Sequence, residues 1–150
     1  QVQTPSQLYH LWMPMLGLHQ VENAAVAVAC AEALTEYGFH INPQAIVHGL
    51  KHISWSSRLE VLGTHPMIVV DGAHNRQSSS RLAQAIRDYF SYNRLLLVMG
   101  CSADKDIDGM AAELVPLVYH ACTAPSLHPK ALPARRVADA FKIRGVTTRS

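Results

Sequence analysis

Short, continuous apolar runs alternate with amphipathic segments throughout the second half of the chain, and this alternation limits the possible folds more than any other feature. The apolar runs are Met67 to Val70, Leu95 to Met99 and Val118 to Thr123. The amphipathic segments are 78–90, 108–115 and 133–143. Short apolar runs predict strands buried on both faces, and the segments between them predict covering helices. Because parallel strands need long right-handed crossovers, the pattern predicts an α/β fold with a doubly wound, mostly parallel sheet.

Apolar residues at helical spacing define the faces that these helices are expected to bury. The expected buried residues are Leu82, Ala85, Ile86 and Tyr89 in the first helix, Met110, Ala111 and Leu114 in the second, and Val137, Ala140 and Phe141 in the third. Gly145 is expected to end the third helix, and Val146 to begin a fourth strand.

The first half of the chain has a helical pattern. Good helix formers fill the range 21–37, which Gly38 is placed to end, so we predict one well-buried helix there. Asn42 followed by Pro43 predicts an N-cap and the start of a shorter helix. The polar stretch 55–57 is typical of a linker.

Composition narrows the class of protein. With 150 residues, the chain has room for one ordinary domain, or for one domain and a piece of another. Apolar residues make up 49% of the chain and charged residues 16%, which favours a soluble globular protein. The formal charge of +2 is scattered and no apolar run is long enough to span a membrane, so we expect neither a nucleic-acid nor a membrane partner. Three cysteines without a C-x-x-C pair favour core positions in a cytoplasmic protein.

Three polar segments follow predicted strands and are expected to meet at one edge of the sheet. They are Asp71 to Asn75, Gly100 to Asp106 and Ala124 to Ala131. Open parallel sheets bind ligands outside the carboxyl ends of their strands. We therefore expect the ligand site at this edge.

Three polar residues stand at a predicted helix start. Asp71 is a hydrogen-bond acceptor, His74 is a donor whose protonation changes near neutral pH, and Asn75 carries an amide. An Asp in this place can bind ribose hydroxyls, and a His can donate to phosphate oxygens beside the positive end of the helix. The alternative is a turn in which Asp71 and Asn75 only accept hydrogen bonds from backbone N–H groups. The residues alone leave both interpretations open.

The next loop places Lys105 between Asp104 and Asp106. Lys105 can bind an anionic substrate while the acids orient its amine. The simpler alternative, which the residues alone favour, is a solvated turn in which Asp106 or Asp108 caps the following helix. Arg58, in the linker, is placed to reach a ligand held between two domains, although a surface Arg is usually only solvated.

Neither metal binding nor a phosphate loop is predicted within the chain. His48 and His52 are spaced i, i+4, but no third ligand follows at a recognisable interval, so we expect no metal site. Neither G-x-x-x-x-G-K-[ST] nor G-x-G-x-x-G occurs in the sequence. This chain therefore lacks a phosphate-binding loop of its own.

Five motifs, taken together, resemble the folylpolyglutamate synthase/dihydrofolate synthase branch of the Mur ligase superfamily. They are Gly17-x-His19-Gln20-x-x-Asn23-Ala24, Trp55-x-x-Arg58-Leu59-Glu60, Asp71-Gly72-Ala73-His74-Asn75, Gly100 with Asp104-Lys105-Asp106, and His128-Pro129-Lys130-Ala131. The resemblance implies a partial ATPase-domain tail in residues 1–54, a linker in 55–60 and a truncated, Rossmann-like glutamate ligase domain in 61–150.

The resemblance also implies an activity. The family uses ATP to activate a folate or dihydropteroate carboxylate as an acyl phosphate, which the amine of L-glutamate then attacks. The implied cofactors are ATP and Mg²⁺, bound mainly by the chain's own missing N-terminal ATPase domain, and we expect a monomer.

Residue roles carry over to matching positions. The resemblance implies that Gln20 and Asn23 lie at the adenine, and that Arg58, Asp71 and His74 bind ATP, with Arg58 at its phosphates. His74 and Lys105 are the implied catalytic candidates. The implied contacts of the incoming glutamate are Asp104, Lys105 and Asp106.

Departures from the family pattern and rival interpretations limit these expectations. The linker has Ser56-Ser57 where the family usually has proline and glycine before the arginine, Arg76 stands where proline is common, and Lys130 replaces a frequent arginine. Because the phosphate loop is absent, we expect no ligase activity from this chain alone. The alternatives are a peptidoglycan Mur ligase, which usually carries tyrosine in place of Gly72, and a non-catalytic nucleotide-binding or interaction module.

Overall fold

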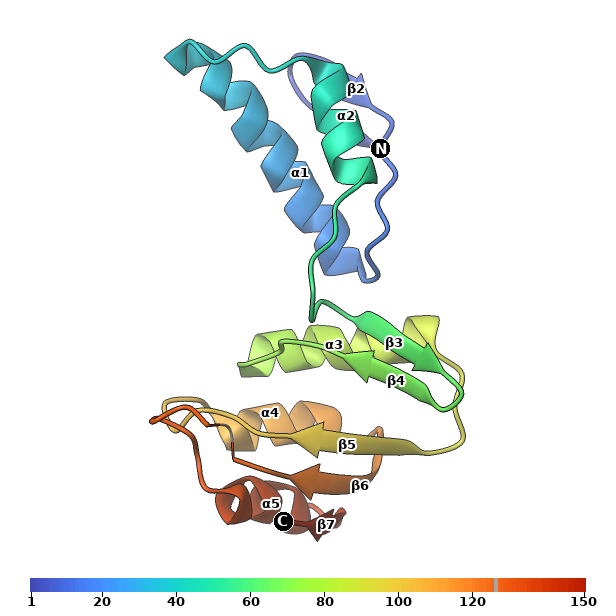
Figure 1. Cartoon of the computed structure of the whole chain (residues 1–150), viewed down its shortest axis with the longest axis vertical. Coiled ribbons are helices and arrows are strands. Elements are labelled where there is room, and N and C mark those ends of the chain that lie inside the picture. The colour runs from blue at the N-terminus through green and yellow to red at the C-terminus, as the bar shows by residue number, and fades with distance from the viewer. Residues whose placement is uncertain (126) are drawn as a thin grey trace. The chain divides into compact units, whose positions relative to one another are not determined.

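The computed structural model describes residues 1–125 and 127–150, and these form two compact units, Gln1–Gly72 and Ala73–Ser150 (Figure 1). The division falls after the expected linker at 55–60, because a β-hairpin that follows the linker belongs to the first unit. The domain limits expected from the sequence stay a prediction.

The first unit contains two short hairpins and two α-helices. Its elements are β1 (Val2–Gln3), β2 (Leu8–Tyr9), α1 (Leu18–Ala33), a 3-10 turn (Leu34–Tyr37), α2 (Pro43–Lys51), β3 (Glu60–Thr64) and β4 (Met67–Val70). Both strand pairs are antiparallel. The sequence predicted β4 but neither β1, β2 nor β3. Its expected place in the parallel sheet is wrong, because β4 pairs with β3 in an antiparallel sheet of two strands.

Helix α1 and the turn after it confirm the predicted helix, which ends where Gly38 adopts a left-handed φ of 83°. The prediction that this helix is well buried is wrong. Only Gln20, Ala24 and Val28 are buried along α1, and Val21 is 48% exposed. The first unit covers just this narrow stripe, so the other apolar side chains of the helix stay on the surface.

Helix α2 begins as its sequence predicts. Asn42 is the N-cap, and its side-chain oxygen accepts a hydrogen bond of 2.8 Å from the backbone N–H of Gln44. Proline fits the next position because the first helical N–H has no partner within the helix.

The second unit is the α/β part of the chain. Its elements are α3 (Arg76–Tyr89), β5 (Leu95–Met99), α4 (Ile107–Leu114), β6 (Val118–Thr123), α5 (Ala134–Lys142) and β7 (Thr147–Arg149). Strands β5, β6 and β7 form a parallel sheet in that order, with β6 in the middle (Figure 1). The predicted α/β fold is thereby confirmed.

The core of the second unit lies between the sheet and its helices. Met110, Ala111 and Leu114 of α4 and Val137, Ala140 and Phe141 of α5 are buried, as predicted. On α3 the prediction is partly wrong, because Tyr89 is 49% exposed and the buried positions are Ser79, Ala83 and Ala85. Small residues on this face let α4 pack close to α3.

Some apolar side chains of the second unit face away from this core. Leu96 and Val98 alternate with the inward-facing Leu97 and Met99 along β5 and are exposed. The prediction that this strand is buried on both faces is therefore wrong. None of the helices described here is both long and apolar enough to cross a membrane.

Candidate functional site

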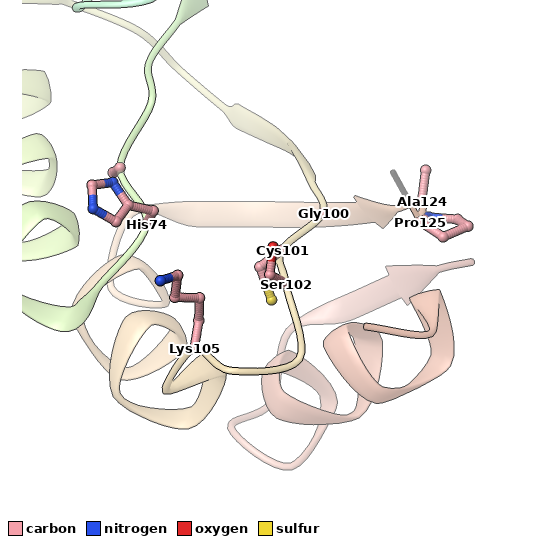
Figure 2. Close-up of a pocket in the computed structure, with 8 residues that line it drawn as sticks. His74, Gly100, Cys101, Ser102, Lys105, Ala124 and Pro125 are labelled. Atoms are coloured by element: carbon pink, nitrogen blue, oxygen red, sulfur yellow. The ribbon is translucent and has the colours of Figure 1, made fainter. Parts of the chain in front are cut away.

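A pocket of about 420 Å³ lies at the carboxyl edge of the parallel sheet, within the second unit (Figure 2). Its lining residues are Ala73, His74, Gly100, Cys101, Ser102, Lys105, Ala124 and Pro125. They come from the three segments that the sequence predicted to share this edge. Ser126, in the third of these segments, lies outside the described residues.

Backbone hydrogen bonds hold two of these segments together. The N–H of Ala103 donates to the carbonyl of Lys130 at 2.7 Å, and the N–H of Leu132 donates to the carbonyl of Cys101 at 2.8 Å. Ser102 and Ala131 form a bridge between these two bonds. The loop after β5 is therefore braced by the loop after β6.

His74 reaches the pocket from the start of α3. Its backbone N–H donates to Ser78 Oγ at 3.0 Å, while Asn75 Oδ1 accepts the N–H of Ser78 at 2.8 Å as the N-cap of α3. For Asn75 the structure thus supports the backbone-capping alternative. The imidazole of His74 lines the pocket, on the side toward which the amine of Lys105 extends (Figure 2).

The three charged residues of the Asp104-Lys105-Asp106 loop have different roles. Lys105 Nζ lies 2.9 Å from Asp104 Oδ2, and the hydrogen bond from Lys105 lowers the pKa of the Asp104 carboxyl. Asp106 is the N-cap of α4, with Oδ1 accepting the N–H of Gly109 at 2.9 Å. Lys105 is thus the candidate that lines the pocket, Asp104 is its partner, and Asp106 occupies the capping role of the simpler alternative.

Cys101 and Ser102 also line the pocket and were not among the predicted site residues. Burial raises the pKa of the Cys101 thiol, and the negative charge of Asp104 raises it further. Their position directly after Gly100, at the end of β5, is the sequence signal that identifies them. The core role expected for the cysteines is wrong for Cys30, which is exposed on α1.

Arg58 and Asp71 lie in the first unit. Arg58 lines a pocket of about 380 Å³ together with Trp55 and with residues of the ranges 14–16, 53–54 and 59–61. Its guanidinium lies 5.9 Å from the centre of the Trp55 ring. Asp71 Oδ2 accepts a hydrogen bond of 2.9 Å from the backbone N–H of Leu59, next to Arg58. The structure therefore brings Arg58 and Asp71 together through the linker backbone.

The other predicted nucleotide contacts are on α1. Asn23 Nδ2 donates to Gln20 Oε1 at 3.2 Å, and Gln20 Nε2 lies 3.1 Å from His19 Nε2. Gln20 is buried, whereas Asn23 is exposed. The two amides form one hydrogen-bonded group, with Asn23 as its accessible member.

The described residues offer no metal centre of their own. They contain no group of three His, Cys, Asp or Glu side chains that could hold a metal ion. His48 and His52 instead place their rings with centroids 4.2 Å apart, and His52 Nδ1 lies 2.9 Å from the His48 carbonyl oxygen.

Comparison with known proteins identifies the domain that carries the pocket. The family described as "Mur ligase, glutamate ligase domain" matches residues 57–150. The chain belongs to this family. The match contains Arg58, Asp71 and the whole pocket of this Mur ligase domain, and leaves Gln20 and Asn23 outside it.

Several relatives of this Mur ligase chain are folate enzymes. A probable bifunctional folylpolyglutamate synthase/dihydropteroate synthase of Halobacterium salinarum is 38% identical over 91% of the chain, and a dihydrofolate synthase/folylpolyglutamate synthase of Bacillus subtilis is 32% identical over 86%. The structure of Mycobacterium tuberculosis folylpolyglutamate synthase complexed with ADP covers 93% of the chain at 30% identity, with a TM-score of 0.82. The resemblance noted in the sequence is thereby confirmed.

The chain spans only part of each of these proteins. It covers 16% of the Halobacterium protein, 30% of the Bacillus protein and 32% of the Mycobacterium chain.

Proposed function

We propose that this Mur ligase domain works as the carboxyl-terminal part of an ATP-dependent ligase that adds L-glutamate to folate, to dihydropteroate or to both, through an acyl phosphate. The observation that carries the proposal is the pocket at the sheet edge, where His74 and Lys105 line a site braced by two loops of a glutamate ligase domain. Cationic and hydrogen-bonding groups in such a pocket suit an anionic amino acid and the negative charge that develops during acyl transfer.

In the proposed reaction, Lys105 binds a carboxylate of the incoming glutamate. Its pairing with Asp104 supports this role, because the 2.9 Å contact holds the lysine side chain beside the pocket before the substrate arrives. His74 donates a hydrogen bond to an oxygen that gains negative charge as the amine attacks. Asp106 contributes by capping α4 and thereby fixing the loop that carries Lys105.

Nucleotide binding is proposed for residues of the first unit and for the separate ATPase domain. Arg58 contacts phosphate oxygens, and Asn23 is the accessible amide of the Gln20–Asn23 group at the adenine. ATP as the nucleotide is supported by the ADP complex of the Mycobacterium relative. A solved folylpolyglutamate synthase/dihydrofolate synthase with Mn, AMPPNP and L-glutamate bound, with a TM-score of 0.78, supports a divalent cation such as Mg²⁺. The cation would neutralise charge on the phosphates, with protein ligands supplied by the ATPase domain.

The same proposal places limits on the isolated chain. We infer that it is a partial enzyme in which residues 1–54 complete an ATPase domain and 61–150 form the ligase domain. The partner of this chain is that ATPase domain, and the complete protein is a cytoplasmic monomer. The chain by itself does not turn over ATP with folate and glutamate.

A second candidate is a peptidoglycan ligase. A UDP-N-acetylmuramoyl-L-alanyl-D-glutamate--2,6-diaminopimelate ligase of Chelativorans is 31% identical over 71% of the chain. The folate enzymes are favoured because they supply the higher identities over longer stretches.

The decisive experiment uses the complete protein, in which the chain follows its ATPase domain. It is incubated with ATP and Mg²⁺, together with glutamate and either dihydropteroate or tetrahydrofolate, or together with 2,6-diaminopimelate and a nucleotide-linked muramoyl peptide. ADP release together with the mass of one added glutamyl group on a pterin acceptor supports the proposal. Product only from the muramoyl peptide, or no product from any acceptor, overturns it.

A substitution tests the pocket. Lys105→Ala is expected to raise the KM for glutamate by about 10- to 100-fold, because a lost charged hydrogen bond costs about 1.5–3 kcal/mol. Lys142→Ala, on the exposed end of α5, is the matched control and should leave the KM unchanged. An unchanged KM in Lys105→Ala would exclude Lys105 from the glutamate site.

A further inference from the structure

The turn that carries Arg58 has an unusual backbone. Ser57 has a φ of 59° and Leu59 a φ of 49°, so two residues with side chains adopt the left-handed region on either side of the arginine. This region is disfavoured for residues other than glycine, and it persists only where the surroundings hold the chain in place. The turn therefore needs structural support.

Three hydrogen bonds supply that support. The Ser57 N–H donates to Glu60 Oε2 at 2.7 Å, the Leu59 N–H donates to Asp71 Oδ2 at 2.9 Å, and the Gly72 N–H donates to the Ser57 carbonyl at 2.8 Å. All three join the turn to residues at the open end of the β3–β4 hairpin, where Glu60 pairs with Val70. The hairpin thus holds the turn at both of its left-handed residues.

The side chains of the turn face different surroundings. Leu59 is 3% exposed, whereas Arg58 is exposed and its guanidinium lies near the Trp55 ring. The buried Leu59 side chain and the three backbone hydrogen bonds fix the position of the Arg58 Cα and the direction of its Cα–Cβ bond. The backbone that carries Arg58 is therefore rigid.

We propose that Asp71 is a positioning residue for Arg58. Its carboxylate holds the Leu59 N–H and keeps the left-handed turn in place, so that Arg58 meets the oxyanions of a polyphosphate in one fixed geometry. Asp71 acts on the nucleotide through Arg58, and this assignment replaces the direct ATP contact expected from the sequence. The identity of the ligand rests on the proposed function, whereas the support of the turn does not.

Hydrogen exchange of the 150-residue chain tests the support directly. NMR would follow the Leu59 and Gly72 amides in the wild type, Asp71→Ala and Asp71→Asn. We expect exchange at Leu59 to accelerate by about tenfold or more in Asp71→Ala, and to stay within about threefold of the wild type in Asp71→Asn, which keeps an acceptor oxygen. Asp88→Ala, on the exposed face of α3, is the control and should change neither amide. Unchanged protection of Leu59 in Asp71→Ala would overturn the proposal.

A double-mutant cycle tests whether Asp71 acts through Arg58. The ATP dissociation constant of the complete ligase would be measured for the wild type, Arg58→Ala, Asp71→Ala and the double variant. If Asp71 only positions the arginine, the double variant binds ATP within about twofold of Arg58→Ala, and Asp71→Asn restores most of the wild-type affinity. Additive losses would show that Asp71 contacts the nucleotide itself and would overturn the proposal.

The two experiments separate this inference from the proposed function. If the complete protein binds no ATP, the ligase proposal fails, and the exchange rates of the chain still decide whether Asp71 holds the turn. If ATP binds and the losses are additive, the ligase proposal stands and the positioning role fails.

Discussion

Arg76 Nε on α3 lies 2.9 Å from Glu113 Oε1 on α4, so an ion pair joins the two helices. The hydrogen bond from Arg76 lowers the pKa of Glu113 below its ordinary value of 4.5. A lowered carboxyl pKa contributes stability that is present above the unfolded value and is lost as the pH falls through the folded value. Because the Arg76 side chain is 66% exposed, we expect Arg76→Ala to lower stability only slightly at neutral pH, with no difference once Glu113 is protonated. Urea denaturation followed by circular dichroism at neutral and acidic pH checks this.

Arg76→Pro is the informative companion variant. Arg76 is the first residue of α3, where the missing N–H of proline costs nothing, and Asn75 before it is extended with φ −148° and ψ 170°, as a residue before proline prefers. We therefore expect Arg76→Pro to be at least as stable as Arg76→Ala, although both lose the ion pair. A proline variant much less stable than the alanine variant would contradict this account of the helix start.

Asp106 offers a test of capping against substrate binding. As the N-cap of α4 it accepts the Gly109 N–H, so Asp106→Ala should destabilise the second unit by about 1 kcal/mol, whereas Asp106→Asn keeps an acceptor and should change stability little. Neither Trp12 nor Trp55 lies in the second unit, so circular dichroism or amide exchange in α4 is the appropriate measurement. Equal stability of Asp106→Ala and the wild type would contradict the capping role.

The elements that the sequence predicted well are those whose pattern is local. Strands β4, β5 and β6 have the predicted limits. For β4 and β5 this is because a continuous apolar run is bounded by residues that break it, Pro66 and Asp71 in the first case and Arg94 and Gly100 in the second. Strand β3 was missed because Glu60 to Thr64 shows neither a continuous apolar run nor an alternating pattern. Its pairing depends on contacts with β4, across an irregular register between Val61 and Gly63. The exposed face of α1 could not be predicted, because helical spacing indicates an apolar face and says nothing of what covers it.

In the candidate site, too, the features set by local pattern were predictable and those set by tertiary contacts were not. The meeting of the loops after β5 and β6 at the sheet edge follows from the parallel topology, and so it was predictable. The third segment follows β4, which pairs with β3 in an antiparallel sheet, so parallel topology does not explain its place beside the pocket. The hydrogen bond from Leu59 to Asp71 was not, because it joins positions twelve residues apart through a backbone conformation that the sequence Ser-Arg-Leu does not favour. Residue types predicted that His74 and Lys105 reach this edge, and they offered helix capping as one role for Asp106. The structure decides between the roles, with Asp106 capping α4 and Asp104 paired with Lys105.

The left-handed backbone of Ser57 leads to a stability prediction. Glycine adopts a φ of 59° without the steric penalty of about 1–2 kcal/mol that a side chain brings, although it also loses more entropy on folding. Ser57→Gly is therefore expected to stabilise the first unit by up to about 1 kcal/mol. Ser56→Gly is the matched control, because the φ of Ser56 is not in the left-handed region, and it should be neutral or destabilising. Tryptophan fluorescence during urea denaturation reports on this unit, and a Ser57→Gly variant less stable than Ser56→Gly would contradict the prediction.

The N-terminal hairpin gives a prediction at alkaline pH. Tyr9 is 3% exposed, and its hydroxyl donates to Glu32 Oε1 at 3.0 Å, an oxygen that also accepts a hydrogen bond from Thr4 Oγ1. Burial raises the pKa of Tyr9 above its ordinary value of 10.0, and the hydrogen bond to Glu32 and its charge raise it further. Since the folded pKa is raised, the stabilising contribution is complete below pH 10.0 and is lost as the pH rises through the folded value.

Tyr9→Phe should therefore lower stability by about 1.5–3 kcal/mol at neutral pH, because one hydrogen bond to a carboxylate is lost. It should also remove the part of the alkaline decline that arises from Tyr9. Tyr37→Phe is the control, because Tyr37 is 78% exposed and should affect neither quantity. The measurement is urea denaturation of the three proteins by tryptophan fluorescence at pH values below and above 10.0. An alkaline decline of the same size in Tyr9→Phe and the wild type would show that the Tyr9 hydroxyl does not couple folding to pH.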